Sequence, residues 1–269
     1  MLMLDRGREL VDRRQVLWLL VVRDLKVRYS SSALGYLWTI IDPLMMAAVY
    51  WLVFGFVFNG ASRGLPPYVV FLVVGVLAWQ WFNAGVMDTT RALQQESKLV
   101  RSTSLPREIW VFKIVLAKGV EFVLSIPVIA LFMAAYGHPP TWAGLWSVPA
   151  AIVLQALLVS GIGLALASLT VIVTDLQRVV RILLRVMFYL TPVLYSVHIL
   201  EKSFDVPHIT QLVALNPMAG IIDLYRRAVF EDTQTPWHVP AIGAVVTLVI
   251  FVVGAWIFRR LEPAVLKEL

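Results

Sequence analysis

The sequence contains no cysteine, and charged residues make up only 15% of its 269 residues. The first absence excludes disulfides, thiolate metal ligands and cysteine nucleophiles. A soluble domain carries about 25% charged residues, so the second absence argues against a large soluble globule. The histidines are scattered without the spacing of a metal site, and we expect none of them to bind a metal: His138, His198, His208 and His238.

The sequence also lacks a phosphate-binding loop of the GxxxxGK[ST] type. In many ATPases that loop holds the phosphates of the nucleotide. We therefore expect this chain to hydrolyse no ATP by itself and to bind no cofactor. Its apolar segments hold no dense series of acids and histidines of the kind that transfers protons across a membrane.

Hydrophobic residues are abundant instead: they make up 59% of the chain and lie in long runs. A helix needs about 20 apolar residues to cross the ~30 Å hydrocarbon core of a bilayer. Runs of about this length predict an all-α integral membrane protein with six transmembrane helices. The predicted spans cover residues 33–59, 66–87, 109–136, 145–173, 178–197 and 239–258.

Basic residues are concentrated in alternate connections between these runs. Many lie before the first span, between the second and third, between the fourth and fifth, and after the sixth. The connections on the other side hold few basic residues, and acids offset several of these. Because Lys and Arg accumulate on the cytoplasmic side of membrane proteins, both termini are predicted to be cytoplasmic. This distribution accounts for the net charge of +6 without a nucleic-acid partner.

Residues 5–30 are predicted to form an amphipathic helix at the membrane surface, because their apolar run is too short to span. Asp24 and Arg28 are spaced to pair across one turn. Charges resume at Arg23 with no small-residue cleavage site before it, which argues against a cleaved signal peptide. The apolar face at helical spacing is Trp18, Val21, Val22, Leu25 and Tyr29, while Leu25, Val27 and Tyr29 also alternate as in a strand.

The polar segment between the second and third spans, residues 88–108, is too long for a tight hairpin. From Gln94 to Arg107 it has a helical pattern, which Pro106 should end. One interpretation is a helix that docks a cytoplasmic motor, and the other is an ordinary solvated loop. Composition leaves both open.

Charged residues inside the predicted spans form a further signal. Lys118 and Glu121 are spaced to pair on one helix, and Asp42 lies about ten residues into the first span. An unpaired charge at mid-membrane costs about 2.5–3.5 kcal/mol on insertion scales, so these residues line a polar substrate path or form a structural ion pair. A basic helix face in the fifth span would attract a substrate's phosphate or, as the default, anchor the span at lipid headgroups: Arg178, Arg181 and Arg185.

Aromatic residues cluster in three of the predicted spans. Aromatic faces stack on sugar rings, so such clusters suit a glycan channel, whereas the alternative for any single residue is an interfacial belt or packing against lipid. Small residues four apart, Gly161 with Ala165 and Gly163 with Ala167, predict close helix packing. The aromatic clusters are Tyr50, Phe54 and Phe58; Trp79, Trp81 and Phe82; and Phe188, Tyr189 and Tyr195.

Three segments together resemble a known family. RDLKVRYSSSALGYLWTIIDPL resembles the opening signature of the ABC type-2 exporter permeases that move O-antigen, teichoic acid, capsule and other cell-wall polysaccharides. SKLVRSTSLPREI resembles the coupling segment of that family, and LNPMAGIIDLYR its segment before the last span. The match departs at Asp42, where the family pattern has asparagine before the proline. The matching residues are Arg23, Asp24, Arg28, Tyr29, Ser32 (one position off the family spacing), Leu34, Gly35 and Trp38; Leu105, Pro106, Arg107 and Glu108; and Asn216, Pro217, Met218 and Arg226.

The resemblance implies a homodimer of permeases bound to two separate nucleotide-binding ATPase subunits, on which ATP and Mg would lie. Residues 1–32 would be a cytoplasmic interface helix and residues 33–269 a six-span permease domain, with a coupling segment at 88–108. Residues 199–230 would form short re-entrant gate helices on the outer side. The substrate would be a polyprenyl-pyrophosphate-linked polysaccharide of O-antigen, teichoic acid or galactan type, which crosses the bacterial inner membrane and enters laterally from the membrane lipids.

The site residues expected on these grounds fall into three groups. The residues for ATPase coupling are Arg23, Asp24, Arg28, Tyr29, Glu96, Arg101, Leu105, Pro106, Arg107 and Glu108. The residues for the channel are Trp38, Asp42, Tyr50, Phe54, Phe58, Trp81, Phe82, Arg181, Arg185, Phe188, Tyr189 and Tyr195. The residues for the gate are Asn216, Pro217 and Arg226.

The sequence leaves two alternatives to polysaccharide export. A type-2 permease for drugs or lipids would share the architecture but not the need for aromatic pore residues. A membrane enzyme acting on polyprenyl lipids is disfavoured, because the sequence has neither a convincing pair of acids on the aqueous side nor a DxD metal motif.

Overall fold

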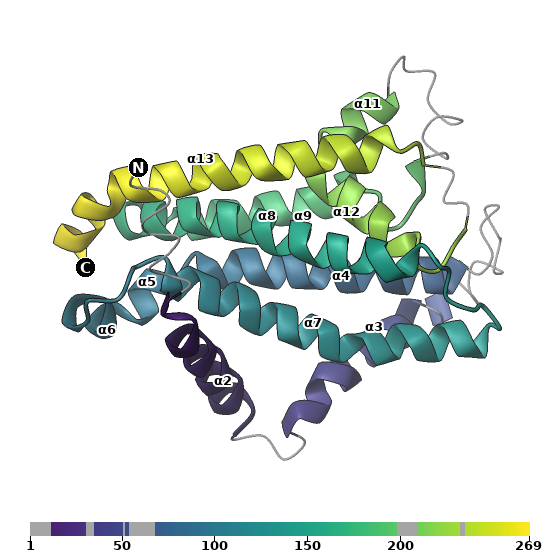
Figure 1. Ribbon diagram of the computed structural model, residues 1–269, viewed down its shortest axis with the longest axis horizontal. Coiled ribbons are helices and arrows are strands. Elements are labelled where there is room, and N and C mark those ends of the chain that lie inside the picture. Colours follow the sequence, from purple (N-terminus) through teal and green to yellow (C-terminus); the bar gives the residue numbers. More distant parts are fainter. Residues whose placement is uncertain (1–11, 31–34, 51, 54–67, 198–208, 232–234) are drawn as a thin grey trace.

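The computed structural model describes residues 12–30, 35–50, 52–53, 68–197, 209–231 and 235–269 (Figure 1). Every regular element in these ranges is a helix, which confirms the all-α class for this part of the chain. The helices are α2 (Arg14–Ser30), η1 (Gly35–Leu37), α3 (Trp38–Tyr50), α4 (Tyr68–Thr89), α5 (Ala92–Gln95), α6 (Ser97–Ser102), α7 (Ile109–Ala135), α8 (Gly144–Ile172), α9 (Leu176–Leu190), α11 (Ile209–Ala214), α12 (Pro217–Arg226) and α13 (His238–Glu268).

Four of the described helices are long and apolar enough to cross a membrane: α4, α7, α8 and α13. They run side by side along the long axis of the molecule (Figure 1). In its most apolar stretch α4 is 83% buried, whereas the corresponding stretch of α13 is only 22% buried. Helix α4 is therefore the centre of the bundle, and α13 leaves most of its apolar surface to lipid or to a partner.

These four helices correspond to the second, third, fourth and sixth predicted spans. The first predicted span is described only in part, as α3. Helix α9, in place of the fifth span, has 15 residues and covers about 22 Å, less than the ~30 Å apolar core. It ends seven residues before the predicted boundary at Val197, because Thr191 precedes Pro192 and takes an extended conformation. The count of six spans stays a prediction.

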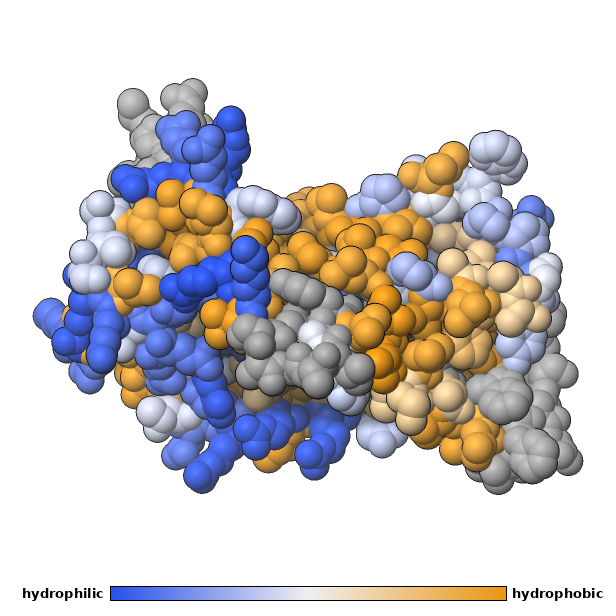
Figure 2. Space-filling view, turned by 90° about the horizontal axis from the view of Figure 1, so that it is seen from below, coloured by the Kyte–Doolittle hydropathy of each residue, from blue (hydrophilic) through white to orange (hydrophobic). Residues whose placement is uncertain are grey.

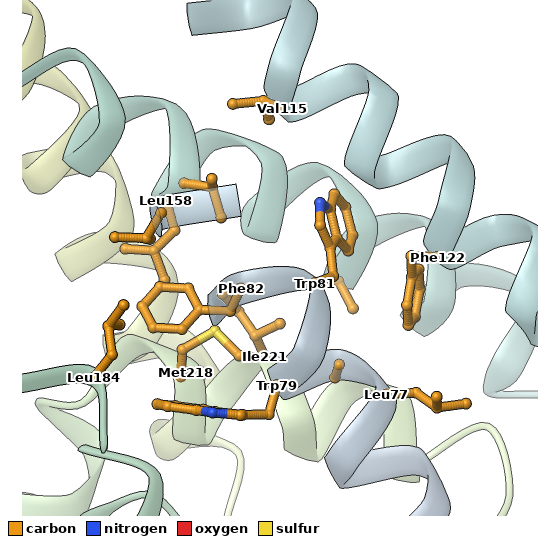
Figure 3. Packing of buried hydrophobic residues seen from close by; sticks show 14 of the residues in the cluster. Leu77, Trp79, Trp81, Phe82, Val115, Phe122, Leu158, Leu184, Met218 and Ile221 are labelled. Carbon is orange, nitrogen blue, oxygen red and sulfur yellow. The ribbon is translucent and has the colours of Figure 1, made fainter. Parts of the chain in front are cut away.

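Large apolar side chains of α4 form the core with helices from distant parts of the sequence (Figure 3). Phe82 is 1% exposed, and its ring centroid lies 5.2 Å from that of Trp79. Leu158 of α8, Leu184 of α9 and Met218 of α12 belong to the same buried cluster. The short helix α12 is thus held against the central helix α4 by hydrophobic packing.

Helices α8 and α13 cross at glycines, as the small-residue pairs predicted. A Cβ at Gly161 would lie 2.5 Å from the Cα of Phe251, and a Cβ at Gly254 would collide with the backbone of Gly161. Gly163 meets α4 instead, where a Cβ would lie 2.8 Å from Oγ1 of Thr89. Only glycine allows the backbones to approach this closely.

One end of the bundle is hydrophilic. Figure 2 shows hydrophilic residues gathered at the end where Figure 1 places α5, α6 and the C-terminus, while hydrophobic residues cover much of the remaining visible face. Helix α2 leaves this end at an angle to the bundle and packs on α7. The residues predicted to contact an ATPase therefore lie at one end of the molecule.

Candidate functional site

Helix α2 packs on α7 through two residues of its apolar face. Val21 is fully buried and Leu25 is 8% exposed, and both pack with Ala117 and Val120 of α7. Trp18, on the apolar face that was predicted to lie in the membrane interface, is 55% exposed, so it is left to contact lipid. The position of α2 at the membrane surface stays a prediction.

Two groups of charges reinforce this contact, and we name them by their place along α2. The proximal cluster consists of Arg23, Asp24, Glu96 and Lys113. Nζ of Lys113 lies 2.7 Å from Oε1 of Glu96 and 3.0 Å from Oδ2 of Asp24. Nη2 of Arg23 lies 2.6 Å from the same Glu96 oxygen. Two acids face two bases, so the cluster is neutral while it joins α2, α7 and the junction between α5 and α6.

Glu96 is the acid that links these elements most directly. Burial opposes ionisation of its carboxyl, but the hydrogen bond and charge of Lys113, together with Arg23, outweigh burial and hold the pKa of Glu96 below its ordinary value. Lys113 is 3% exposed, so its ammonium depends on these carboxylates for compensation.

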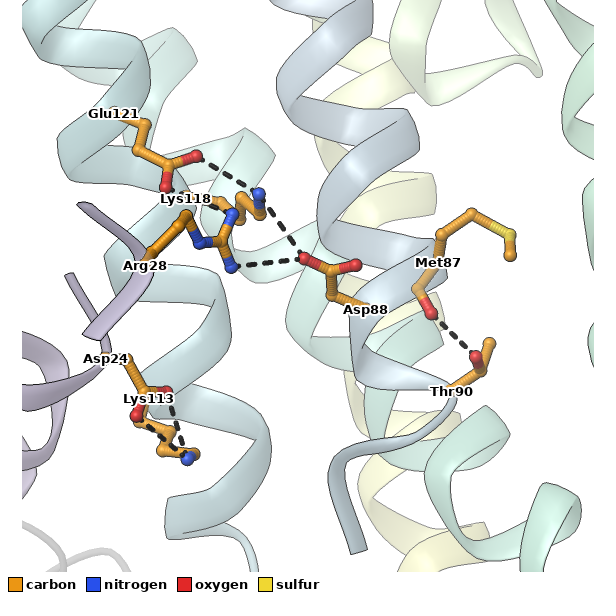
Figure 4. A network of polar contacts seen from close by, with 8 residues as sticks. All are labelled: Asp24, Arg28, Met87, Asp88, Thr90, Lys113, Lys118 and Glu121. Carbon is orange, nitrogen blue, oxygen red and sulfur yellow. Dashed lines mark hydrogen bonds and ion pairs between the residues drawn. The ribbon is translucent and has the colours of Figure 1, made fainter. Parts of the chain in front are cut away.

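The distal cluster consists of Arg28, Asp88, Lys118 and Glu121 (Figure 4). Nζ of Lys118 lies 3.1 Å from Glu121 and 3.3 Å from Asp88. Arg28 lies 3.1 Å from Glu121 and 3.5 Å from Asp88. This cluster is also neutral, and it joins α2 to α7 and to the end of α4.

The pairing within α7 was predicted correctly, but the pairing within α2 was not. Lys118 and Glu121 form the expected ion pair. Asp24 and Arg28 were expected to pair with each other, but Asp24 contacts Lys113 and Arg28 contacts Glu121. Charges on a neighbouring helix with less access to solvent offer stronger partners than a pair on one exposed helix face. Tyr29, the remaining predicted residue of this helix, lies in its last turn.

The coupling segment folds as two short helices, α5 and α6, and not as one helix to Pro106. Helix α6 ends at Ser102, and Thr103 is extended. Arg101 is exposed and Leu105 is half-buried, whereas Pro106 and Glu108 are buried. Arg107 lies 3.6 Å from Glu262 of α13. The segment is therefore attached both to α2, through Glu96, and to the C-terminal helix.

A cavity of about 280 Å³ lies between α3, α4 and α7. Three predicted channel residues line it: Trp38, Asp42 and Trp81. Lys118 and Glu121 of the distal cluster form another part of its wall. The sequence interpretation missed the remaining polar residues, Gln80 and Ser125, although a polar residue within an apolar run is a readable signal.

The other predicted channel residues lie elsewhere. Phe82 is in the core, and Phe188 contacts Trp79 edge-on at 5.6 Å. Tyr189 is 66% exposed, and its carbonyl oxygen accepts a hydrogen bond of 3.0 Å from the hydroxyl of Tyr195. The exposed basic face of α9 carries Arg181 and Arg185, Tyr50 ends α3, and Phe54 and Phe58 lie outside the described residues.

The predicted gate residues are held tightly. Asn216 caps α12: its Oδ1 accepts from the amide of Met218 at 3.1 Å, and its Nδ2 donates to Oγ1 of Thr191 at 2.8 Å. Pro217 follows in the first turn, where its lack of an N–H is harmless. Arg226, which is 5% exposed, donates to the carbonyl oxygens of Pro192 and Val193, both at 2.7 Å.

A second arginine of this region was missed at the sequence level. Arg227 lies 2.8 Å from Asp223 and stacks 3.7 Å from the ring centroid of Trp237. The charges of Asp223 and Arg227 one turn apart were the signal that could have revealed it.

Within the described ranges, no group of three or more His, Asp or Glu side chains could hold a metal ion. The clusters that are present are balanced ion pairs that connect helices. Such an arrangement can transmit the position of α2 to α7, α4 and the cavity wall.

A family model described as ABC-2 type transporter matches residues 15–230. O-antigen export system permease proteins RfbA are among the similar proteins: one from Myxococcus xanthus is 33% identical over 260 residues, covering 96% of this chain and 97% of its own length. One from Klebsiella pneumoniae is 32% identical over 240 residues, or 89% of each chain. The polysialic acid transport protein KpsM of Escherichia coli is 22% identical over 255 residues, or 93% of this chain and 94% of its own.

Proposed function

The chain belongs to the ABC-2 type transporter family, and we propose that it is the membrane permease subunit of an ATP-driven exporter for a lipid-linked cell-surface polysaccharide. Relatives that align over most of their length are named as permeases or transport proteins for O-antigen, polysialic acid and capsule polysaccharide. The substrate class of this chain, which includes O-antigen, teichoic acid and galactan polymers on a polyprenyl pyrophosphate, is inferred from that similarity.

In this proposal the hydrophilic end of the bundle faces the cytoplasm of a bacterium and both termini lie on that side. Two ATPase subunits bind there and supply ATP and Mg. The attachment of Glu96 to both Arg23 and Lys113 is the observation that carries the proposal, because it joins α2, the α5–α6 junction and α7 at that end. A push on α2 or α6 would reach the spans through side chains already in contact.

We place the translocation path between two copies of the chain. Helix α9 exposes a long apolar face, including Ile182, Leu183, Val186 and Leu190, and α3 exposes Met45 and Val49. A second copy would cover these faces. Arg181 and Arg185, which have no acid partner among the described residues, would then lie beside the path, since an arginine at a membrane is found in a polar cavity or at the headgroups. There they would attract the pyrophosphate of the carrier lipid.

The mechanism is a shift between two populations. ATP binding draws the ATPase subunits together, and the clusters on α2 carry that movement to α7 and α4. Short helices α11 and α12, joined to the turn after α9 by Arg226, would act as the outer gate. This chain contributes the path and its gates, while hydrolysis takes place on the partner.

The test is reconstitution of the chain with its ATPase partner in proteoliposomes that contain a polyprenyl-pyrophosphate-linked glycan. With the ATPase and ATP outside the vesicles, the glycan should become protected from an external glycosidase, and it should stay accessible with a hydrolysis-deficient ATPase. ATP-dependent efflux of apolar dyes without movement of the glycan would replace the proposal by a drug or lipid permease. Glycan movement by the chain alone would also contradict it.

A further inference from the structure

The cavity between α3, α4 and α7 has walls of an unusual composition for a membrane protein. Two tryptophans, Trp38 from α3 and Trp81 from α4, lie on it together with the carboxylate of Asp42 and the amide of Gln80. Its volume of about 280 Å³ is that of a small ligand, and smaller than the ~300–1,000 Å³ typical of drug-sized sites. The cavity thus offers both flat apolar surface and hydrogen-bonding groups in a space for one small polar unit.

The charges on the wall restrict what that unit can be. Asp42 and Glu121 are acids, and Lys118 is the one base among the residues that line the cavity, so the wall has a net charge of −1. Lys118 is already engaged by Glu121 and by Asp88. A phosphate or pyrophosphate would meet net repulsion here, while a metal cation would compete with the ammonium of Lys118.

Asp42 is the acid that remains available. Among the described residues no base lies within ion-pair distance of it, whereas Glu121 is bound by Arg28 and Lys118. Asp42 is exposed, so its carboxylate can accept hydrogen bonds from water or from a ligand. A carboxylate can accept bonds from two neighbouring hydroxyls, and an amide such as Gln80 can both donate and accept.

The indole of Trp81 is held in a fixed orientation. Its ring stacks on that of Phe122, with centroids 5.0 Å apart and planes inclined by 23° (Figure 3). On another side it contacts α7, where a Cβ at Gly119 would lie 3.1 Å from its ring. Because Trp81 is only 4% exposed, it forms part of the rigid wall of the cavity and leaves no open ring face to a ligand.

We propose that this cavity is a subsite for a single neutral sugar residue. It would hold the C–H face of the sugar ring against the indole of Trp38, which is 40% exposed, and the hydroxyls against Asp42 and Gln80. The inference rests on the proposed function and adds to it a place and a charge preference: the subsite takes an uncharged sugar and excludes the pyrophosphate. Lys118 and Glu121 of the distal cluster form one wall of the cavity. Because Arg28 of α2 is ion-paired with Glu121, the position of Arg28 determines how far that carboxylate is available to the sugar.

The experiment is saturation-transfer NMR on the permease–ATPase complex in nanodiscs. The probes are methyl glycosides of glucose, galactose and mannose, with methyl glucuronide as the matched charged sugar. We expect saturation transfer to at least one neutral glycoside and weaker transfer to the glucuronide. Asp42→Asn, at an exposed position, should weaken binding of the neutral glycoside about fivefold or more. It should also reduce the difference in binding between neutral and charged sugars.

Asp175→Asn, an exposed acid at the start of α9, is the matched control and should bind as the wild type does. The subsite would be overturned by no transfer to any neutral glycoside, by equal binding in wild type and Asp42→Asn, or by a preference for the glucuronide. Glycan movement is measured for the same variants in proteoliposomes. Movement without glycoside binding overturns the subsite alone, whereas binding without movement overturns the export function and leaves the subsite standing.

Discussion

A Cβ added to Gly75 of α4 would lie 2.8 Å from Nη2 of Arg226 and 2.9 Å from the carbonyl oxygen of Val193. Glycine at this position leaves the space through which Arg226 reaches the turn after α9. The guanidinium also lies 3.3 Å from the ring centroid of Phe71. Helices α4, α9 and α12 are therefore connected by one buried side chain.

The first prediction concerns this connection. Arg226→Met should lower the stability of the protein by about 2–4 kcal/mol, because two buried carbonyl groups lose their donor. Gly75→Ala should cost about 1–3 kcal/mol by overpacking. Thermal unfolding monitored by size-exclusion chromatography measures both. Arg260→Met, at an exposed position of α13, is the control, and equal melting temperatures for Arg226→Met and Arg260→Met would contradict the role of Arg226.

The second prediction concerns the neutrality of the proximal cluster. Lys113→Met leaves two acids facing Arg23 alone and should destabilise the protein by about 3 kcal/mol or more. The double variant with Asp24→Asn restores neutrality and should recover part of the loss. The measurement is a double-mutant cycle in thermal stability and ATP-dependent export, with Lys98→Met, an exposed lysine of α6, as the control for stability. Additive effects of the two substitutions would show that the charges act independently.

The third prediction is a dependence on pH through Glu96. The folded protein holds the pKa of Glu96 below its ordinary value of 4.5. The ionised carboxylate therefore stabilises the fold fully above pH 4.5, and this contribution is lost as the pH falls through the pKa of the folded state. Wild type should exceed Glu96→Gln in melting temperature at pH 7, and the difference should shrink below pH 4.5. Glu231→Gln, at an exposed acid, should show no such change in difference. A gap that widens in acid would be the opposite of the expected sign.

The fourth prediction concerns the crossing of α8 and α13. Gly161→Ala should destabilise the chain by about 1–3 kcal/mol, since its Cβ would meet backbone atoms of Phe251 that cannot rotate away. Gly161→Leu should cost more and expose α13 to protease. Unchanged melting of both variants would mean that the two helices are not in close contact in the membrane.

The fifth prediction concerns the contact between the coupling segment and the C-terminal helix. Arg107→Glu places two acids together and should reduce ATP-dependent export without preventing membrane insertion. Adding Glu262→Arg restores opposite charges and should recover part of the export. Glycan protection measures export and membrane fractionation measures insertion. Full export by Arg107→Glu would remove the coupling segment from the proposed mechanism.

Several features followed from local sequence because short-range physics determines them. The apolar runs predicted α4, α7, α8 and α13, since bilayer thickness sets the length of a span. The spacing of Lys118 and Glu121 predicted their ion pair, and Gly161 predicted a close helix crossing. The start of α12 was not predicted, although Asn216 before Pro217 is a capping signal that local sequence carries.

The tertiary structure alone decided which residues meet across helices. Asp24 and Arg28 take partners on α7, Trp18 remains outside the contact, and Asp42 meets Trp81 across a cavity whose walls come from three separate helices. Helical periodicity specifies which residues share a face but not which neighbour covers it. That choice depends on packing between segments far apart in the sequence, such as those of Lys113 and Asp24, which are 89 residues apart, and on the charges that such packing leaves uncompensated.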